Sequence, residues 1–226
     1  MVSAGPRTIV VFSDIACPWA HICIHRLHTT RARLGLAGRV SFEPHAFPLE
    51  IINEEPTPKR TLEAEIPVAG GLEPEAGWQI WGRATYEWPT SMLPALEAVQ
   101  AARAQGTGAA EALDRALRIA FFRDSRVVAM RHEILDIAAG CDGVDTAKLK
   151  EALDDGRARR AVIEDKAASD EAAVEGSPHL FLPDGTDVHN PGIELHWVGE
   201  HGAGFPVVDK DDPSIYEELL ERAASH

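Results

Sequence analysis

The stretch Thr8-Ile-Val-Val-Phe12, followed after a short turn by Cys17-Pro18-Trp19-Ala20, decides how this chain folds and where its chemistry lies. The first segment is apolar and β-branched, which predicts a short buried strand. Pro18 suits the first position of a helix, where its missing N–H is not needed. Cys17 would then cap that helix, whose free N–H groups favour a thiolate. The sequence therefore predicts a reactive cysteine between a strand and a helix, with a thiol pKa below the free value of about 8.5.

The cysteine pattern points to chemistry through one thiol. Cys17, Cys23 and Cys141 do not make a disulfide framework in a chain of 226 residues. Ala20 occupies the position where a C-x-x-C motif has its second thiol. Cys23 falls on the apolar stripe of the predicted helix, so we assign it to the core, and we place Cys141 in a loop. For Cys17 to reach Cys23, the start of the helix would have to unwind.

Composition limits the class of protein. The net charge of -14 argues against binding to nucleic acid or to an anionic membrane. No stretch approaches the roughly 18 uninterrupted apolar residues of a membrane-spanning helix. The segment before Thr8 lacks the anatomy of a signal peptide, so we expect a cytoplasmic protein. The length suits one large domain, or one domain with an insertion.

Periodicity along the rest of the chain predicts a β-α-β segment, a block of helices and then a β-β-α segment. A second strand is expected over 40–47, and residues 50–77, rich in Pro, Gly and Glu, are expected to form a long loop. About ninety helical residues follow. The β pattern returns over 180–188, before a final helix over 214–224. This order predicts an α/β fold, a thioredoxin-like sheet with an inserted helical block, and places Cys17 at the carboxyl end of the first strand.

Four segments in register resemble the DsbA-like thioredoxin-fold family and, within it, the cytoplasmic FrnE-type branch. The four segments are Asp14 to Trp19, Pro89 to Gly106, Ala116 to Phe122 with Ile134-Leu135 downstream, and Ala172 to Leu182. The resemblance extends over residues 8–225. It implies a thioredoxin-like domain over residues 1–70 and 157–226, with a helical insertion over 71–156.

The resemblance also implies roles for residues at the site. Cys17 matches the attacking cysteine of the family, and Pro178, preceded by Ser177, matches its cis-proline. A cis bond there would turn the backbone of Ser177 toward the sulfur, where it could pair with an extended substrate or a small thiol. We assign further substrate contacts to Pro18, Trp19 and His179.

His21 lies one helical turn after Cys17, and helical side chains lean toward the N-terminus. An imidazolium there could stabilise a Cys17 thiolate, so we assign His21 a catalytic role; a half-exposed surface histidine is the alternative. His25 and His28 continue the spacing, but one helix rarely supplies three ligands, and we expect no metal site. Asp14 either forms the turn or, if close, raises the pKa of the thiol.

This chain also departs from the family pattern, which ends C-P-W-C. A neighbouring branch, the kappa-class glutathione transferases and hydroxychromene-carboxylate isomerases, shares the inserted helical block and carries serine where this chain has Cys17. We therefore expect a thiol–disulfide oxidoreductase that acts through Cys17 alone, with an external small thiol resolving the mixed disulfide. Two alternatives stay open, a transferase or isomerase that uses a small thiol, and a non-catalytic binding module.

The same reasoning sets the expected cofactors and partners. We expect no tightly bound cofactor, and a small, glutathione-like thiol as co-substrate. Partners would be disulfide-containing proteins or small thiols, and neither nucleic acid nor a membrane. The sequence leaves the oligomeric state open, a homodimer included.

Overall fold

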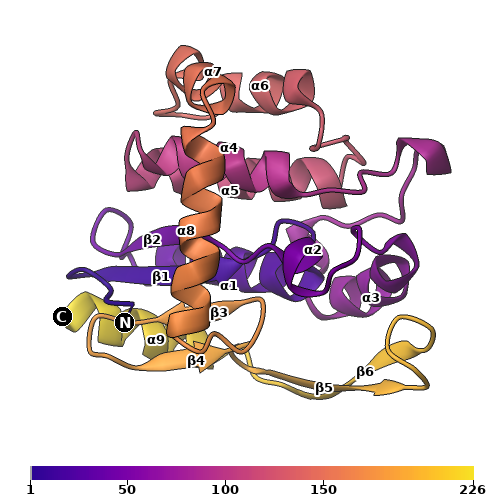
Figure 1. The fold of residues 1–226 in the computed structure, drawn as a ribbon. Helices are drawn as coiled ribbons and strands as arrows, with labels where there is room; N and C mark the ends of the chain where they lie inside the picture. Colours follow the sequence, from indigo (N-terminus) through magenta and orange to yellow (C-terminus); the bar gives the residue numbers. More distant parts are fainter. Residues whose placement is uncertain (1) are drawn as a thin grey trace.

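The structure is a computed structural model that describes residues 2–226 (Figure 1). At its centre is a four-stranded sheet in the order β2-β1-β3-β4. The strands are β1 (Thr8–Ser13), β2 (Ser41–Ala46), β3 (His179–Phe181) and β4 (Asp187–His189). β1 pairs parallel with β2 and antiparallel with β3, and β3 pairs antiparallel with β4. Because β1 is central and buried on both faces, its sequence is a continuous apolar run rather than an alternating one.

Two helices cover one side of this sheet. α1 (Pro18–Arg33) follows β1 directly and packs against the last helix, α9 (Ile215–Ser225). The core between them and the sheet is formed by apolar side chains that include Ile9, Val11, Leu27, Leu180 and Leu220. Each fully buried side chain of this kind contributes about 1.5–3 kcal/mol. This core holds the start of α1, and with it Cys17, at the carboxyl end of β1.

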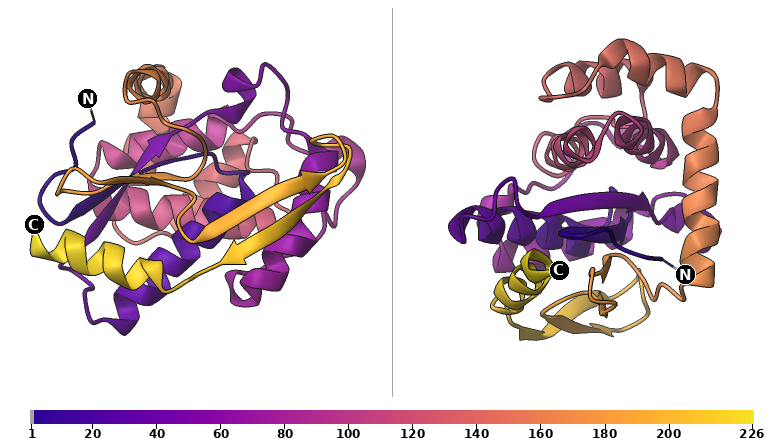
Figure 2. Two further views of the ribbon diagram at one scale, coloured as in Figure 1. Left: turned by 90° about the horizontal axis from the view of Figure 1, so that it is seen from below. Right: turned by 90° about the vertical axis from the view of Figure 1, so that its left-hand side faces the viewer.

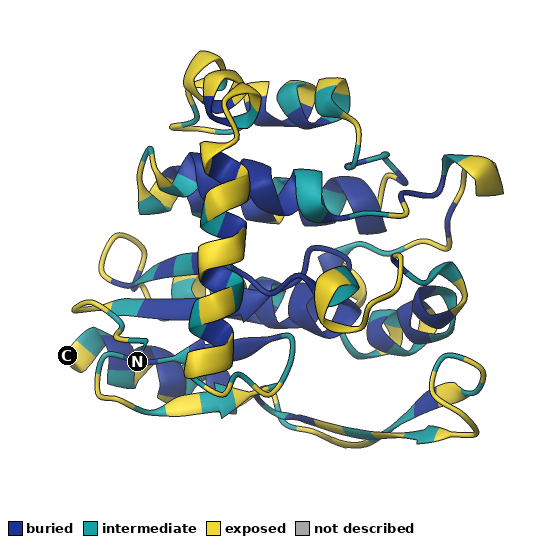
Figure 3. Ribbon diagram, in the orientation of Figure 1, coloured by how far each residue is buried: buried dark blue, intermediate teal, exposed yellow. Residues whose placement is uncertain are grey.

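The inserted helices lie on the other side of the sheet. α4 (Leu93–Arg103) and α5 (Thr107–Phe122) contact β2 and are buried along most of their length (Figure 3). α6 (Arg131–Ala139) and α7 (Thr146–Asp154) form a further layer beyond them, and α8 (Arg157–Glu171) runs back to the sheet (Figure 2). The amphipathic stripe of α5 is buried at Leu113, Leu117 and Phe121. No helix in residues 2–226 has the length and apolar character needed to cross a lipid bilayer.

The prediction of a long loop over residues 50–77 was wrong. The structure has two helices there, the short α2 (Leu49–Ile52) and the longer α3 (Lys59–Leu72). α3 keeps Pro67 in its interior, contacts α1 and β6, and buries Leu62, Glu65, Ile66 and Ala69. The spacing of these residues is helical, but the Pro and Gly content of the segment obscured it. The residues beyond α3 are also not continuously helical, since short 3-10 turns at Pro74–Ala76 and Thr85–Glu87 precede α4.

A second, two-stranded sheet follows β4. β5 (Ile193–Val198) and β6 (Phe205–Asp211) form an antiparallel hairpin that projects beside α3 (Figure 1). Gly204 is required near its turn, because a Cβ there would lie 2.0 Å from the Val198 carbonyl oxygen. No strand was predicted for this segment, although apolar and polar residues alternate from Ile193 to Trp197 in the manner of a strand. The hairpin matters because it forms one wall of the cleft described next.

Candidate functional site

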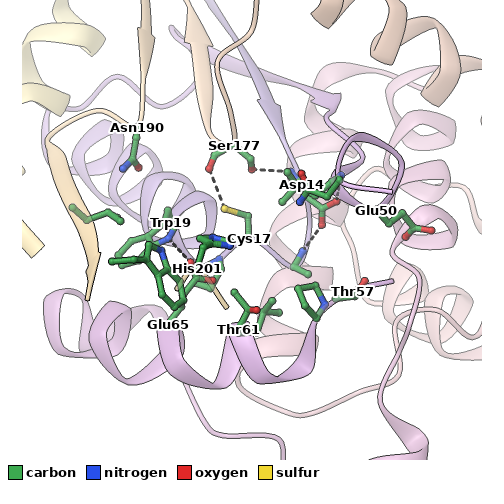
Figure 4. Close-up of a pocket in the computed structure, with 18 of the residues that line it drawn as sticks. Asp14, Cys17, Trp19, Glu50, Thr57, Thr61, Glu65, Ser177, Asn190 and His201 are labelled. Atoms are coloured by element: carbon green, nitrogen blue, oxygen red, sulfur yellow. Dashed lines mark hydrogen bonds between the residues drawn. The ribbon is translucent and has the colours of Figure 1, made fainter. Parts of the chain in front are cut away.

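Cys17 lies where the sequence places it, between the carboxyl end of β1 and the first turn of α1. It is the N-cap residue of α1, and Pro18 is the first helical residue. Its side chain is 6% exposed, and the sulfur faces a cleft of about 610 Å³ (Figure 4). That volume falls in the range of small-molecule sites. Cys17 is the one cysteine of residues 2–226 that lines this cleft.

The cleft has walls from four parts of the chain. One wall is α2 with the segment that leads to α3, which contributes Leu49, Glu50, Asn53, Glu55, Thr57 and Pro58. The β1–α1 turn and Ser177 form the end that holds the sulfur. α3 supplies one side and the β5–β6 hairpin another, with a mixture of apolar, hydroxyl and acidic groups. The side chains from these two walls are Thr61, Leu62, Glu65, Ile193, Glu194, Leu195, Trp197 and His201.

Ser177 connects the cleft to β3. The Ser177–Pro178 peptide bond is cis. The Cys17 thiol donates a hydrogen bond to the Ser177 carbonyl oxygen at 3.0 Å, and the Asp14 N–H donates to the Ser177 hydroxyl at 3.0 Å (Figure 4). Pro178 does not line the cleft, and its carbonyl oxygen accepts a hydrogen bond from the Asn190 N–H at 2.9 Å. Ser177 is therefore the residue of this pair that faces the cleft.

Asp14 forms the turn before Cys17, one of the two roles expected for it. One carboxylate oxygen accepts from the Ala16 N–H at 2.8 Å, and the other accepts from the Leu49 N–H at 3.0 Å. The side chain is 2% exposed, and burial raises the pKa of Asp14 to about 6. Asp14 thus ties the turn to the start of α2, and its charge acts on the thiol as well.

Arg118 supports the same turn from α5. It is fully buried and donates to the Asp14 carbonyl oxygen at 2.7 Å and to the Ser13 hydroxyl at 2.8 Å. Its guanidinium also makes a bidentate pair with Asp114, at 2.9 and 3.0 Å. The inserted helices therefore position the turn that holds Cys17.

The expected low pKa of Cys17 is not what the structure shows. Burial raises the pKa of the Cys17 thiol to about 12, and the nearby carboxyl groups of Glu65 and Asp14 raise it further. The Ser177 side chain and the Ala20 backbone act in the opposite direction, but they do not offset burial. The prediction gave more weight to the helix start than to burial, and burial has the larger effect. The thiol is therefore protonated and donates to the Ser177 carbonyl oxygen.

His21 does not act on the sulfur as expected. Its side chain is 3% exposed and lies between Trp78 and Phe122, with a ring nitrogen 3.1 Å from the Ala76 carbonyl oxygen. Burial lowers the pKa of His21 to about 3, so the ring is neutral at physiological pH. A neutral ring outside the cleft cannot supply the positive charge that we assigned to it.

The other assigned contact residues divide into two groups. Pro18 and Trp19 line the cleft together with Ser177. His179 does not, because its buried ring is 2.9 Å from the Asp187 carboxylate and stacks on Phe181. His179 is instead a buried residue at the start of β3.

Glu65 is a cleft residue that the sequence analysis missed. It lies on α3, in the segment expected to be a loop, and accepts a hydrogen bond from the Trp19 indole N–H at 2.9 Å (Figure 4). The side chain is 8% exposed, and burial raises the pKa of Glu65 to about 7. The helical spacing of Leu62, Glu65, Ile66 and Ala69 was the signal that could have placed it on a buried face.

The other two cysteines lie away from the cleft. Cys23 is 1% exposed and packs in the core beside Tyr216, while Cys141 is half-buried near α5. All three cysteines are free thiols. Within residues 2–226 no cluster of three His, Cys, Asp or Glu side chains could hold a metal ion.

Comparisons with known proteins agree with this geometry. A protein-family model described as a DSBA-like thioredoxin domain matches residues 8–200. No curated protein matches the chain. Several solved structures share its fold at low sequence identity, which supports the fold alone.

Four of these structures illustrate the range. A cytosolic disulfide reductase, DsbM from Pseudomonas aeruginosa, is 16% identical with a TM-score of 0.63 over 96% of this chain and 95% of its own. A second structure of DsbM contains GSH. A probable DsbA oxidoreductase from Streptomyces coelicolor is 18% identical with a TM-score of 0.68 over 97% and 90%. A 2-hydroxychromene-2-carboxylate isomerase is 15% identical with a TM-score of 0.59 over 80% and 87%.

Proposed function

Because this chain belongs to the DsbA-like thioredoxin domain family, we propose that it exchanges thiols and disulfides through the single sulfur of Cys17. The observation that carries the proposal is the position of the three cysteines. Cys17 meets the cleft, Ala20 stands in place of a resolving cysteine, and Cys23 is sealed in the core. An internal disulfide would need the first turns of α1 to unwind, so the second thiol comes from solution.

The reaction has two steps. Cys17 sulfur attacks one sulfur of a mixed disulfide, the old S–S bond breaks, and a new S–S bond joins Cys17 to the small thiol. The proton of Cys17 ends on the released thiol. A free small thiol then attacks the small-thiol sulfur of this mixed disulfide. A symmetric small disulfide leaves, and the proton of the attacking thiol passes to Cys17, which is restored as a thiol. The net result is reduction of the substrate by one free small thiol, which leaves as a disulfide with the small thiol that had blocked the substrate.

The surroundings of Cys17 support this sequence of steps. The Ser177 carbonyl oxygen and the cleft walls leave room for an extended group beside the sulfur. DsbM, which has a similar fold, is a cytosolic disulfide reductase and has been solved with GSH. We extend the same compartment to this chain, because reducing conditions keep its three cysteines as thiols and supply the small thiol.

The test is turnover of a peptide whose cysteine is blocked by mercaptoethanol, with mercaptoethanol as the reductant. The wild-type protein should release the peptide thiol, and Cys17→Ser should be inactive. Cys23→Ser is the matched control and should keep full activity, since Cys23 lies in the core. Loss of activity in a folded Cys23→Ser variant, or full activity in Cys17→Ser, would contradict the proposal.

A second candidate, transfer or isomerisation with a bound small thiol, is favoured by the protonated state of Cys17. The Cys17 S–H donates to the Ser177 carbonyl oxygen, and it could instead donate to the thiolate of a bound small thiol. Serine can donate the same hydrogen bond. Conjugation of glutathione to 1-chloro-2,4-dinitrobenzene should therefore survive in Cys17→Ser if this candidate is correct, whereas disulfide exchange cannot survive.

A further inference from the structure

The cleft around Cys17 carries negative charge that few positive groups offset. Five of its lining side chains have carboxyl groups, Asp14, Glu50, Glu55, Glu65 and Glu194, and none is lysine or arginine. Among residues 2–226, a cationic partner is found for Glu194 alone, which lies 3.5 Å from Lys210. Lining side chains that can become positive are limited to His189 and His201.

Glu65 has an unused acceptor that faces this space. One carboxylate oxygen accepts from Trp19 at 2.9 Å, and the other accepts no hydrogen bond from residues 2–226. The side chain is 8% exposed and lines the cleft. This second oxygen is not sealed from the cleft, so a cationic donor on a bound molecule can reach it and form a charge-assisted hydrogen bond.

The sulfur has no lysine or arginine beside it in the cleft. A thiolate at Cys17 forms beside Glu65 and Asp14, both of which oppose it. His21 is neutral and lies outside the cleft. Arg118 acts on the sulfur from behind the turn, but its guanidinium is already paired with Asp114. A positive charge on the substrate would therefore add the stabilisation that the cleft itself does not supply.

This inference rests on the exchange function proposed above. We propose that the cleft selects small thiols and disulfides that carry a positively charged amine, with the ammonium group on Glu65 and the sulfur at Cys17. In the reaction with such a disulfide, Cys17 sulfur bonds to one aminothiol, the S–S bond breaks, and the second aminothiol leaves with the Cys17 proton. Anionic thiols such as glutathione meet repulsion in the same space.

The test compares three disulfides of similar size, each in excess, by intact mass and peptide mapping of the Cys17 adduct at pH 8.5. The probes are cystamine, neutral bis(2-hydroxyethyl) disulfide and anionic 3,3′-dithiodipropionate. The measured quantity is the rate with cystamine divided by the rate with the neutral probe, because effects on thiol ionisation cancel in this ratio. Glu65→Gln removes the charge and keeps an acceptor for Trp19. Glu164→Gln is the matched control, an exposed glutamate on α8 without an ion pair and away from the cleft.

We expect the rate to fall in the order cationic, neutral, anionic in the wild-type protein. The cystamine ratio should fall about tenfold in Glu65→Gln, as for loss of one charge-assisted hydrogen bond in a buried site, and stay unchanged in Glu164→Gln. If all three probes label Cys17 but Glu65→Gln leaves the ratio unchanged, the charge selection is wrong and the exchange function stands. If no probe labels Cys17, both are wrong.

Discussion

Replacing Arg118 with methionine should weaken the attachment of the inserted helices to the turn that carries Cys17. Arg118 is fully buried and donates four hydrogen bonds, two to Asp114, one to the Ser13 hydroxyl and one to the Asp14 carbonyl oxygen. Methionine fills similar space but donates none. The variant therefore leaves the 3% exposed Asp114 carboxylate without a partner, together with two neutral acceptors.

The expected loss follows from these contacts. Removing one partner of a buried ion pair costs about 3–5 kcal/mol, because the other charge stays buried and unpaired. Asp114→Asn removes that charge, so the double variant Asp114→Asn/Arg118→Met should lose less than the sum of the two single variants. We expect a coupling of about 2 kcal/mol, within the range for residues that share a hydrogen-bond network.

The assay is urea unfolding at pH 7 of the wild type, both single variants and the double variant. Unchanged slopes would show that the unfolding transition is comparable in all four proteins. A loss under about 1 kcal/mol in Arg118→Met, or strict additivity in the double variant, would refute the view that this network holds the turn.

Three further predictions concern the cleft. Burial raises the pKa of Glu65 from 4.5 to about 7. Between these pH values the folded state binds more protons than the unfolded state. The stability linked to this proton is therefore fully present below pH 4.5 and is lost as the pH rises through 7. One pH unit corresponds to about 1.4 kcal/mol, so the free energy of unfolding of Glu65→Gln relative to the wild type should increase by about 2–3 kcal/mol from about pH 5 to about pH 8, as measured by urea unfolding. The same relative free energy at both pH values would contradict the raised pKa. With a pKa of about 12, alkylation of Cys17 by iodoacetamide should speed up about tenfold per pH unit from about pH 7 to about pH 10, and a plateau below about pH 8.5 would show a thiolate that the structure does not support. Ala20→Cys should form an internal disulfide with Cys17 and reduce insulin, since position 20 lies one turn along α1; a variant that still forms only mixed disulfides would show that the missing cysteine is not what limits the parent.

Much of the fold could be predicted because its signals are local. The apolar run of β1 and Pro18 at the helix start each depend on a few neighbouring residues, and both appear in the structure where expected. α3 was missed because Pro67 and its glycines obscured a buried stripe. The β5–β6 hairpin lies outside the main sheet, and its packing against α3 is a long-range contact that local patterns do not contain.

The site was predictable in position and less so in electrostatics. Cys17 and Ser177 could be placed together from the motif at each, and the structure brings them within 3.0 Å. The pKa of Cys17 and the state of His21 depend on burial by segments distant in sequence, including Glu65 on α3 and Phe122 on α5. Desolvation depends on the whole fold, so one stretch of sequence could not show whether the pKa of Cys17 would be lowered or raised.

The central claim, exchange through one sulfur, is tested most directly by the product of mild oxidation. The protein is treated with excess bis(2-hydroxyethyl) disulfide, and its intact mass and peptide map are recorded before and after mercaptoethanol is added. The account predicts one mercaptoethanol adduct, on Cys17, which persists until the thiol is supplied and is then released. An internal disulfide between Cys17 and Cys23, or an adduct on Cys141 with Cys17 unmodified, would contradict it.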